Sequence, residues 1–235
     1  MTLPVLSVPR FKTLLPLSNK EIEYRPFLVK EEKLLILANE SNNVSDVTDA
    51  IENIVKNCTD GAVDAQNNSM FDVQHMFLQI RGKSIGESLE FYFICKKDEC
   101  NNKKSMEINV SDFKLTSTPE HTDMIDLGNG CNLKMRYPTF KDFSLLYEDD
   151  KDDNVYDVVA SCIEQIITQE EVIVNKRDNI KEYREFVDNL TPDQFSKIEK
   201  FFETMPILKF ETTYTCEACG TVNDITIDGI RNFFG

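Results

Sequence analysis

The chain lacks tryptophan and has only two histidines, eight glycines and eight prolines among its 235 residues. Catalytic zinc sites keep an open position and usually include histidine, so a site of that kind is a poor expectation here. Positive charge is also scarce, because 26 Lys and Arg face 41 Asp and Glu and leave a formal net charge of −15. A surface this acidic repels phosphate backbones and anionic lipid, which argues against nucleic acid and membrane as partners.

Long apolar runs are missing as well. No stretch reaches the roughly 18 residues that span a bilayer. The N-terminal segment Met1–Leu15 contains Pro4, Pro9, Arg10 and Lys12 and does not follow the basic, apolar, small-residue order of a signal peptide. We therefore expect the protein in the cytosol, where thiols stay reduced and cysteines need an explanation other than disulfides.

Four of the seven cysteines form two close pairs. Cys95 and Cys100 are spaced C-x4-C, and Cys216 and Cys219 are spaced C-x2-C with Gly220 directly after them. Four thiolates are a common ligand set for structural zinc, and C-x2-C is the usual spacing of a zinc knuckle. The pairs predict one structural Zn²⁺ held by all four cysteines. The alternative is four unpaired thiols, or two unrelated reduced pairs.

The segments around the two pairs resemble each other. Residues 91–113 predict a strand, a cysteine pair, a polar turn and Ile108-x-Val110, and residues 210–230 repeat this order with Ile225-x-Ile227. Each reads as a hairpin with its cysteines at the tip. Tying together segments more than a hundred residues apart costs roughly 4 kcal/mol in chain entropy. Zinc at four thiolates offers about 10–16 kcal/mol, so the clasp should hold.

Hydrophobic periodicity predicts an α+β fold, in which helical bundle segments pack with a small antiparallel, zinc-ribbon-like β element that joins distant parts of the chain. A single helix is expected along the apolar stripe of residues 155–166, and a helix with a capping box is expected to begin at Thr191. The predicted regions are an extended N-terminal arm (1–27), a helical region (28–85), a β-rich region with the first cysteine pair (86–138), a second helical region (139–206), and the second cysteine hairpin with a terminal helix (207–235).

Two other motifs are better explained as local structure. Gly82–Gly86 matches G-x-S-x-G, but a nucleophile elbow needs a strand before the serine and a helix after it, and the predicted order is the reverse. A P-loop would need glycine where Phe77 stands. A turn after a helix ending at Gly82 fits better. The acidic run Glu148–Asp153 is expected to be a solvated loop, or else a docking site for a basic partner.

The remaining histidines and cysteines are expected to be structural. His75 falls within a predicted helix and His121 in a predicted loop, so neither is expected to bind metal. Cys58, Cys131 and Cys162 stand alone on apolar stripes or strands and are expected to be core thiols. No set of carboxylates is placed as acid–base catalysis requires, and no small-molecule substrate is expected.

Several stretches, taken in order, carry a family resemblance: Arg25–Leu35, Leu190–Phe195, Phe201–Pro206, Cys216–Gly220 and Ile225–Phe234. They resemble the baseplate hub and hub-assembly proteins of T-even-type contractile-tailed bacteriophages. The resemblance implies a non-enzymatic role, as a hub component or as a chaperone-like assembly factor, with other hub or tail proteins as partners. It implies a location in the host cytoplasm during assembly, and possibly in the tail baseplate of the virion. No catalytic residue carries over.

Such a role is physically plausible, and two rival functions remain open. The proline-rich arm could add a strand to a neighbour. An intracellular zinc-ribbon adaptor of the transcription or replication machinery is the first rival, although it would be expected to carry a basic face. An enzyme with an unrecognised site is the second. Six apolar residues could anchor an interface, with an ordinary core position as the alternative for each: Phe27, Leu28, Phe201, Phe202, Phe233 and Phe234.

Overall fold

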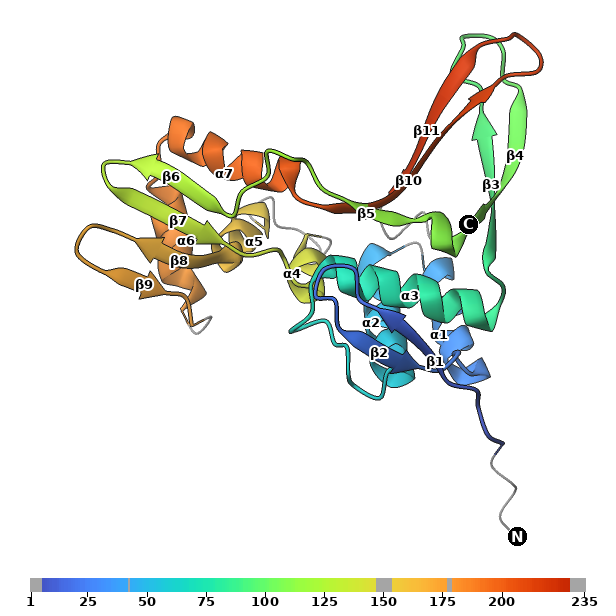
Figure 1. Cartoon of the computed structure of the whole chain (residues 1–235), viewed down its shortest axis with the longest axis horizontal. Helices are drawn as coiled ribbons and strands as arrows, with labels where there is room; N and C mark the ends of the chain where they lie inside the picture. The colour runs from blue at the N-terminus through green and yellow to red at the C-terminus, as the bar shows by residue number, and fades with distance from the viewer. Residues whose placement is uncertain (1–5, 42, 147–153, 177–178, 229–235) are drawn as a thin grey trace. The chain divides into compact units, whose positions relative to one another are not determined.

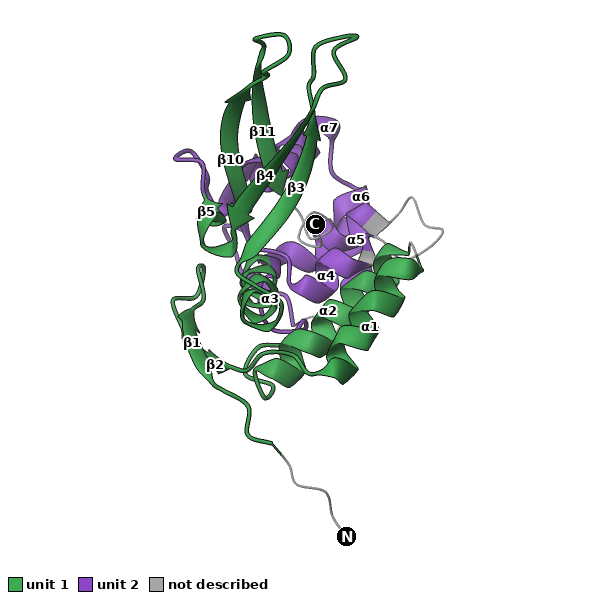
Figure 2. Ribbon diagram, turned by 90° about the vertical axis from the view of Figure 1, so that its right-hand side faces the viewer, with its two compact units in different colours: residues 1–64, 71–116, 207–235 green, residues 65–70, 117–206 purple. Residues whose placement is uncertain are grey.

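The computed structural model describes residues 6–41, 43–146, 154–176 and 179–228 (Figure 1). Helices and antiparallel sheets alternate along the chain, so the fold is mixed α+β, as the sequence predicts. The chain divides into two compact units, each made of several pieces (Figure 2). The first unit comprises residues 1–64, 71–116 and 207–235, and the second comprises residues 65–70 and 117–206.

Helices α1 (Val29–Glu40), α2 (Val44–Cys58) and α3 (Met70–Ser84) form the helical part of the first unit. An N-terminal hairpin, β1 (Phe11–Leu14) with β2 (Glu21–Tyr24), is bonded to the helices through Arg25 N–H, which donates to the Cys58 carbonyl at 2.9 Å. Residues 11–24, expected to belong to an extended arm, therefore form a hairpin. The core side chains of the hairpin and of α2 include Leu15, Ile22, Tyr24, Val47, Ile51, Ile54, Val55 and Cys58.

A buried ion pair closes the start of α1. Glu31 is only 1% exposed, and its carboxylate accepts from the Arg25 guanidinium at 3.0 Å and from the Leu28 amide at 2.7 Å. Each contact satisfies an oxygen that would otherwise be desolvated without a partner. The pair therefore joins the end of the N-terminal hairpin to the first turn of the helix.

Two long hairpins complete the first unit. β3 (Ser88–Ile94) pairs with β4 (Lys103–Asn109), and β10 (Ile207–Thr215) pairs with β11 (Val222–Asp228). A short strand, β5 (Lys114–Thr116), follows a 3-10 turn over Val110–Asp112 and pairs with the start of β10. Figures 1 and 2 both show the hairpins side by side with their tips at the same end. The tips are where the two cysteine pairs lie.

The second unit is built on a four-stranded antiparallel sheet in the order β6-β7-β8-β9. Its buried cluster includes Leu133 and Ile163 from the sheet, and Cys162, Ile198 and Phe201 from helices. The elements of this unit are β6 (Met124–Gly128), β7 (Cys131–Met135), α4 (Phe140–Leu145), α5 (Asn154–Cys162), β8 (Ile163–Ile167), β9 (Val172–Val174), α6 (Ile180–Asp188) and α7 (Pro192–Thr204).

The prediction of a single helix over residues 155–166 is wrong for residues 163–166. Helix α5 ends at Cys162, and Ile163–Ile167 continues directly as strand β8, paired with β7 on one side and β9 on the other. Branched residues favour extended structure where neighbouring strands can bury them, and Ile163 and Ile166 are buried in this sheet. The apolar stripe is real, but it passes from a helix face to a sheet face.

Two sequence predictions fall on residues outside the described ranges. These are the acidic run Glu148–Asp153 and the terminal helix expected around Ile230 and Phe233. Among the described residues, every helix is too short or too polar to span a bilayer.

Candidate metal centre

The four paired cysteines come from equivalent places on the two long hairpins. Cys95 directly follows β3 and its amide donates to the Asn102 carbonyl across the turn, at 2.9 Å. Cys216 directly follows β10 and its amide donates to the Thr221 carbonyl at 2.8 Å. In each hairpin, the hydrogen bonding between the two strands thus extends one residue past the strand. It holds the main chain of the first cysteine in place. This matches the internal similarity seen in the sequence.

Tight turns bring the second cysteine of each pair back beside the first. The Gly220 amide donates to the Cys216 carbonyl at 2.8 Å, and Gly220 has φ of +71°, a conformation that favours glycine. In the longer first turn, Glu99 and Asn101 have φ of +64° and +47° on either side of Cys100. The C-x4-C turn therefore needs two strained residues where the C-x2-C turn needs one glycine.

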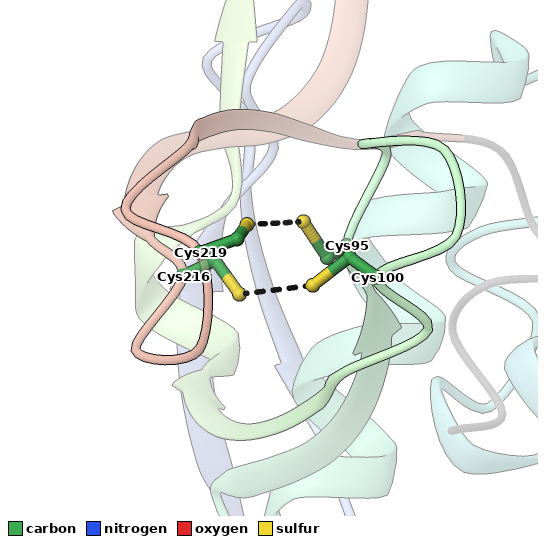
Figure 3. Close-up of side chains that lie close together, drawn as sticks. All are labelled: Cys95, Cys100, Cys216 and Cys219. Carbon is green, nitrogen blue, oxygen red and sulfur yellow. Dashed lines mark hydrogen bonds between the residues drawn. The ribbon is translucent and has the colours of Figure 1, made fainter.

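All four sulfurs converge (Figure 3). Cys95 Sγ lies 3.7 Å from Cys219 Sγ, and Cys100 Sγ lies 3.7 Å from Cys216 Sγ. All four atoms lie within 4.8 Å of one another, so they could hold a metal ion. These separations are far longer than the S–S bond of about 2.05 Å in a disulfide. The two separations of 3.7 Å are close to the edge of about 3.8 Å expected for a tetrahedron of sulfurs 2.3 Å from a zinc ion.

Two asparagines donate hydrogen bonds to the sulfurs from the opposite hairpin. Asn223 on β11 is 2% exposed, and its amide group lies 3.6 Å from Cys95 Sγ while its carbonyl accepts from the Lys96 amide at 2.8 Å. Asn102 donates to Cys216 Sγ at 3.5 Å. Donors of this kind stabilise the thiolate form and orient the ligand. They also connect the hairpins without a metal.

Charged contacts add to this connection. Lys104 of β4 pairs with Glu217 of the second turn at 2.6 Å, and the Lys96 ammonium donates to the Asp224 carbonyl at 2.6 Å. The Lys104–Glu217 pair is exposed and contributes little stability on its own. Both contacts join the two hairpins, as the asparagine bonds do, so the two tips are matched at several points.

Within the cluster, the thiol pKa differs between Cys100, Cys216 and Cys219. The Thr221 hydroxyl, 3.3 Å from the sulfur, and then the Thr221 amide lower the pKa of Cys219 to about 6. Burial alone would raise the pKa of Cys216, but backbone amides of its own turn outweigh burial and lower it. A backbone amide lowers the pKa of Cys100, yet the neighbouring sulfurs, Cys219 first, raise it to about 12. Without a metal the cluster therefore holds both thiolate and thiol, and a bound cation would displace the remaining protons.

Neither histidine belongs to the cysteine cluster. His75 Nε2 lies 3.2 Å from Thr13 Oγ1, and burial lowers its pKa. His121 stacks on Tyr137 and lies against Phe201, with its Nδ1 3.0 Å from Thr204 Oγ1. Both rings serve packing within their own units, as the sequence suggests.

The lone cysteines and the G-x-S-x-G segment are also structural. Cys58 and Cys162 are buried and Cys131 is partly buried. Ser84 lies in the last turn of α3, where its hydroxyl donates to the Ile80 carbonyl at 2.6 Å and accepts from the Phe27 amide at 3.0 Å. The helix continues two residues past Gly82, the end that the sequence predicts.

The sequence gives no sign of Asn102 or Asn223 as contributors. Neither belongs to a metal-binding motif, and each reaches the cluster only because two hairpins that are distant in sequence lie side by side. Their position in the hairpins is the one signal that could have identified these two asparagines. Both lie within two residues of a hairpin turn that carries a cysteine pair.

The geometry leaves open what kind of protein carries this centre, and comparison with known families decides that point. The family described as T4 bacteriophage base plate protein matches residues 8–235, nearly the whole chain. The chain belongs to this family. Both cysteine pairs of the base plate protein lie inside the matched range. No curated protein and no solved structure matches the chain.

Membership confirms the phage resemblance at the level of the family. It supports a structural role for this base plate protein and interaction with other tail or baseplate proteins. The family description says nothing of a hub, an assembly factor or a metal.

Proposed function

We propose that the chain is a non-enzymatic component or assembly factor of the phage baseplate hub, stabilised by one structural zinc ion at Cys95, Cys100, Cys216 and Cys219. Two observations support this function. The first is the match to the T4 base plate protein family over residues 8–235. The second, which carries the metal assignment, is the convergence of four sulfurs from the tips of two hairpins.

The chemistry of the donor set favours zinc in a structural role. Four thiolates in a tetrahedron suit Zn²⁺, and a site closed by four protein ligands leaves no position for substrate or water. Oxygen-seeking cations such as Mg²⁺ and Ca²⁺ are poorly served by sulfur. The role of the ion is then to hold the two hairpins in register, which gives neighbouring proteins a rigid surface to bind.

The metal assignment is tested by elemental analysis of the purified full chain. We expect about one zinc per chain, and we expect the Cys216→Ser/Cys219→Ser double variant to lose it because two ligands cannot hold a structural zinc. Cys131→Ser is the matched control, since that cysteine is partly buried but lies outside the cluster, and it should keep the full metal content. A double variant that retains one zinc per chain would refute the assignment.

The hub assignment is tested in infected cells. A tagged chain should co-purify with hub and tail proteins during assembly in the host cytoplasm. Recovery in finished virions would identify a component, and recovery only in assembly intermediates would identify a chaperone-like factor. Co-purification with polymerase or replication proteins instead would favour the zinc-ribbon adaptor, a function that the net charge of −15 already disfavours.

A further inference from the structure

An apolar groove lies between helices α4, α5 and α7, within the second unit. Its volume is about 620 Å³, and its lining is mostly apolar, including the aromatic rings of Phe143, Tyr156, Phe195 and Phe202. Protein pockets that take up a bound molecule have volumes in this range and linings of this kind. The groove is therefore a candidate binding surface.

Several apolar side chains of the groove remain in contact with solvent. Leu146, Val155 and Tyr156 are 38%, 54% and 39% exposed. Burying such side chains against another molecule is favourable, because it removes apolar surface from water. Val158 and Val159 belong to the core cluster and also line the groove, so a partner side chain would pack directly on the core of this unit.

Two glutamates give the groove a negative rim. Glu199 and Glu203 both line it, are both exposed and lie four residues apart on α7. Like charges at this spacing on a helix repel each other. Among the described residues, neither carboxylate has a basic side chain at ion-pair distance: Lys197 donates to the Asp126 carbonyl, and Lys200 lines a different pocket. A cation supplied by a partner would relieve this repulsion.

The walls of the groove determine which kind of segment fits. Helices α4, α5 and α7 bond their main-chain groups internally, so the described residues offer no strand edge to an extended segment here. A helix satisfies its own main-chain groups and needs only an apolar face, which is how amphipathic helices bind to grooves. The groove-lining stripe of α7, from Phe195 to Glu203, is about 12 Å long, which matches two turns of a partner helix.

We propose that this groove binds an amphipathic helix of another protein, whose apolar face fills the groove and whose lysine or arginine side chains, four residues apart, pair with Glu199 and Glu203. The net charge of −15 favours a basic partner in general, and the two glutamates locate that preference at the groove. The inference names the partner chemistry of the proposed function, and it rests on that function only in that the chain acts by binding other proteins.

Two synthetic helical peptides of about 15 residues test the charge preference. Both carry leucines along one face, and beside that face the first has lysines four residues apart where the second has glutamates. Fluorescence anisotropy with the full chain should show binding of the lysine peptide and about tenfold weaker binding of the glutamate peptide. Glu199→Lys/Glu203→Lys should reverse this order. Glu170→Lys/Glu171→Lys, which changes the net charge equally at exposed residues outside the groove, should keep it.

An apolar substitution tests the floor of the site. Val155→Gln replaces an exposed groove residue, so it should leave the fold intact by circular dichroism and weaken binding of the lysine peptide about fivefold. Ile36→Gln is the matched control, because Ile36 is 51% exposed on helix α1 and lies outside the groove. This control should bind the lysine peptide as the wild type does.

Equal binding of the two peptides, or an unchanged preference in Glu199→Lys/Glu203→Lys, would overturn the proposal. A wild-type chain that binds neither peptide at up to about 1 mM would also overturn it, and the proposed function would still stand if the chain co-purifies with tail proteins. A dimer of the full chain that Val155→Gln disrupts would show a second copy as the occupant and count against a basic helix. Should the double-lysine variant fail to fold, equal binding by Val155→Gln and Ile36→Gln would refute the site.

Discussion

Within the first unit, Glu31 joins the end of the N-terminal hairpin to the first turn of α1. Its carboxylate lies almost fully inside the protein between Arg25 and the Leu28 amide. Burial would raise the pKa of Glu31, but the bond from Arg25 and then the Leu28 amide outweigh burial and lower it. A carboxylate that is buried and bonded in this way stabilises the fold as long as it stays ionised.

The direction of the pH dependence follows. The pKa of Glu31 is lower in the folded state than in the unfolded chain, so its contribution is fully present above the unfolded value of about 4.3 and is lost as the pH falls through the folded value. We expect Glu31→Gln to lower the free energy of unfolding by about 2–3 kcal/mol at pH 7, because it leaves Arg25 without its charged partner. Urea titrations at several pH values should show the difference from wild type shrinking below about pH 4.

The adjacent Glu32→Gln variant is the control, since it removes one acidic charge and leaves the Arg25–Glu31 pair intact. A difference between Glu31→Gln and wild type that is constant from pH 7 to pH 3 would contradict the proposed ionisation. Equal effects of the two variants at pH 7 would show that the buried pair adds no stability beyond a general charge effect.

At the scale of elements, α7 begins with a complete capping box. Thr191 Oγ1 accepts from the Gln194 amide at 3.3 Å, and Gln194 Oε1 accepts from the Thr191 amide at 3.0 Å. The Gln194 side chain also donates to the Leu127 carbonyl of β6 at 3.2 Å. The box therefore fixes both the start of the helix and its position on the sheet of the second unit.

Removing this cap should have a measurable and modest cost. We expect Thr191→Ala to lower the free energy of unfolding by about 1 kcal/mol, because one amide of the first turn loses its acceptor. Thr191→Ser, which keeps the hydroxyl, should retain most of the stability. Chemical denaturation of the three proteins under identical conditions provides the comparison, and an alanine variant as stable as wild type would show that the box is dispensable.

Elements with strong local signals could be predicted from the sequence. The capping box marks the start of α7, and the apolar spacing of Val47, Ile51 and Ile54 marks α2, so both agree with the structure to within about a residue. The change from α5 to β8 could not be predicted, because its apolar stripe satisfies a helix and a sheet equally well. Strand β1 was missed for another reason: four residues between prolines carry too little pattern to identify a strand.

The candidate site also contains residues that the sequence predicts and residues that it does not. The convergence of Cys95, Cys100, Cys216 and Cys219 was predictable because each pair carries its own spacing and matching flanks. The roles of Asn102 and Asn223 were not, because a hydrogen bond across two hairpins depends on how they lie in space and leaves no local pattern in the sequence.

At the scale of the whole molecule, the cysteine cluster joins two separate pieces of the first unit, residues 71–116 and 207–235. The second unit has its own buried cluster, and none of its described residues belongs to the cysteine cluster. Removal of the proposed zinc ion should therefore act on the first unit more than on the second.

Hydrogen exchange on the zinc-loaded protein, with and without a strong chelator, tests this separation. We expect chelation to reduce amide protection at the buried Leu89 of β3 and Ile225 of β11, while protection at Leu133 and Ile166 in the second unit stays nearly unchanged. Uniform loss of protection in both units would show that they unfold together. No loss anywhere would show that the metal adds nothing to the hairpins.

The interleaving of the two units has a consequence for how the protein is made. The ribosome completes the second unit, which ends at residue 206, before it has synthesised the final hairpin that the first unit requires. Residues 71–116 therefore cannot complete their native contacts until Cys216 and Cys219 have been synthesised. Until then, Cys95 and Cys100 lack their partners. The unit whose translation starts first is thus the last to finish folding, and capture of the proposed zinc ion would be a closing step of biosynthesis.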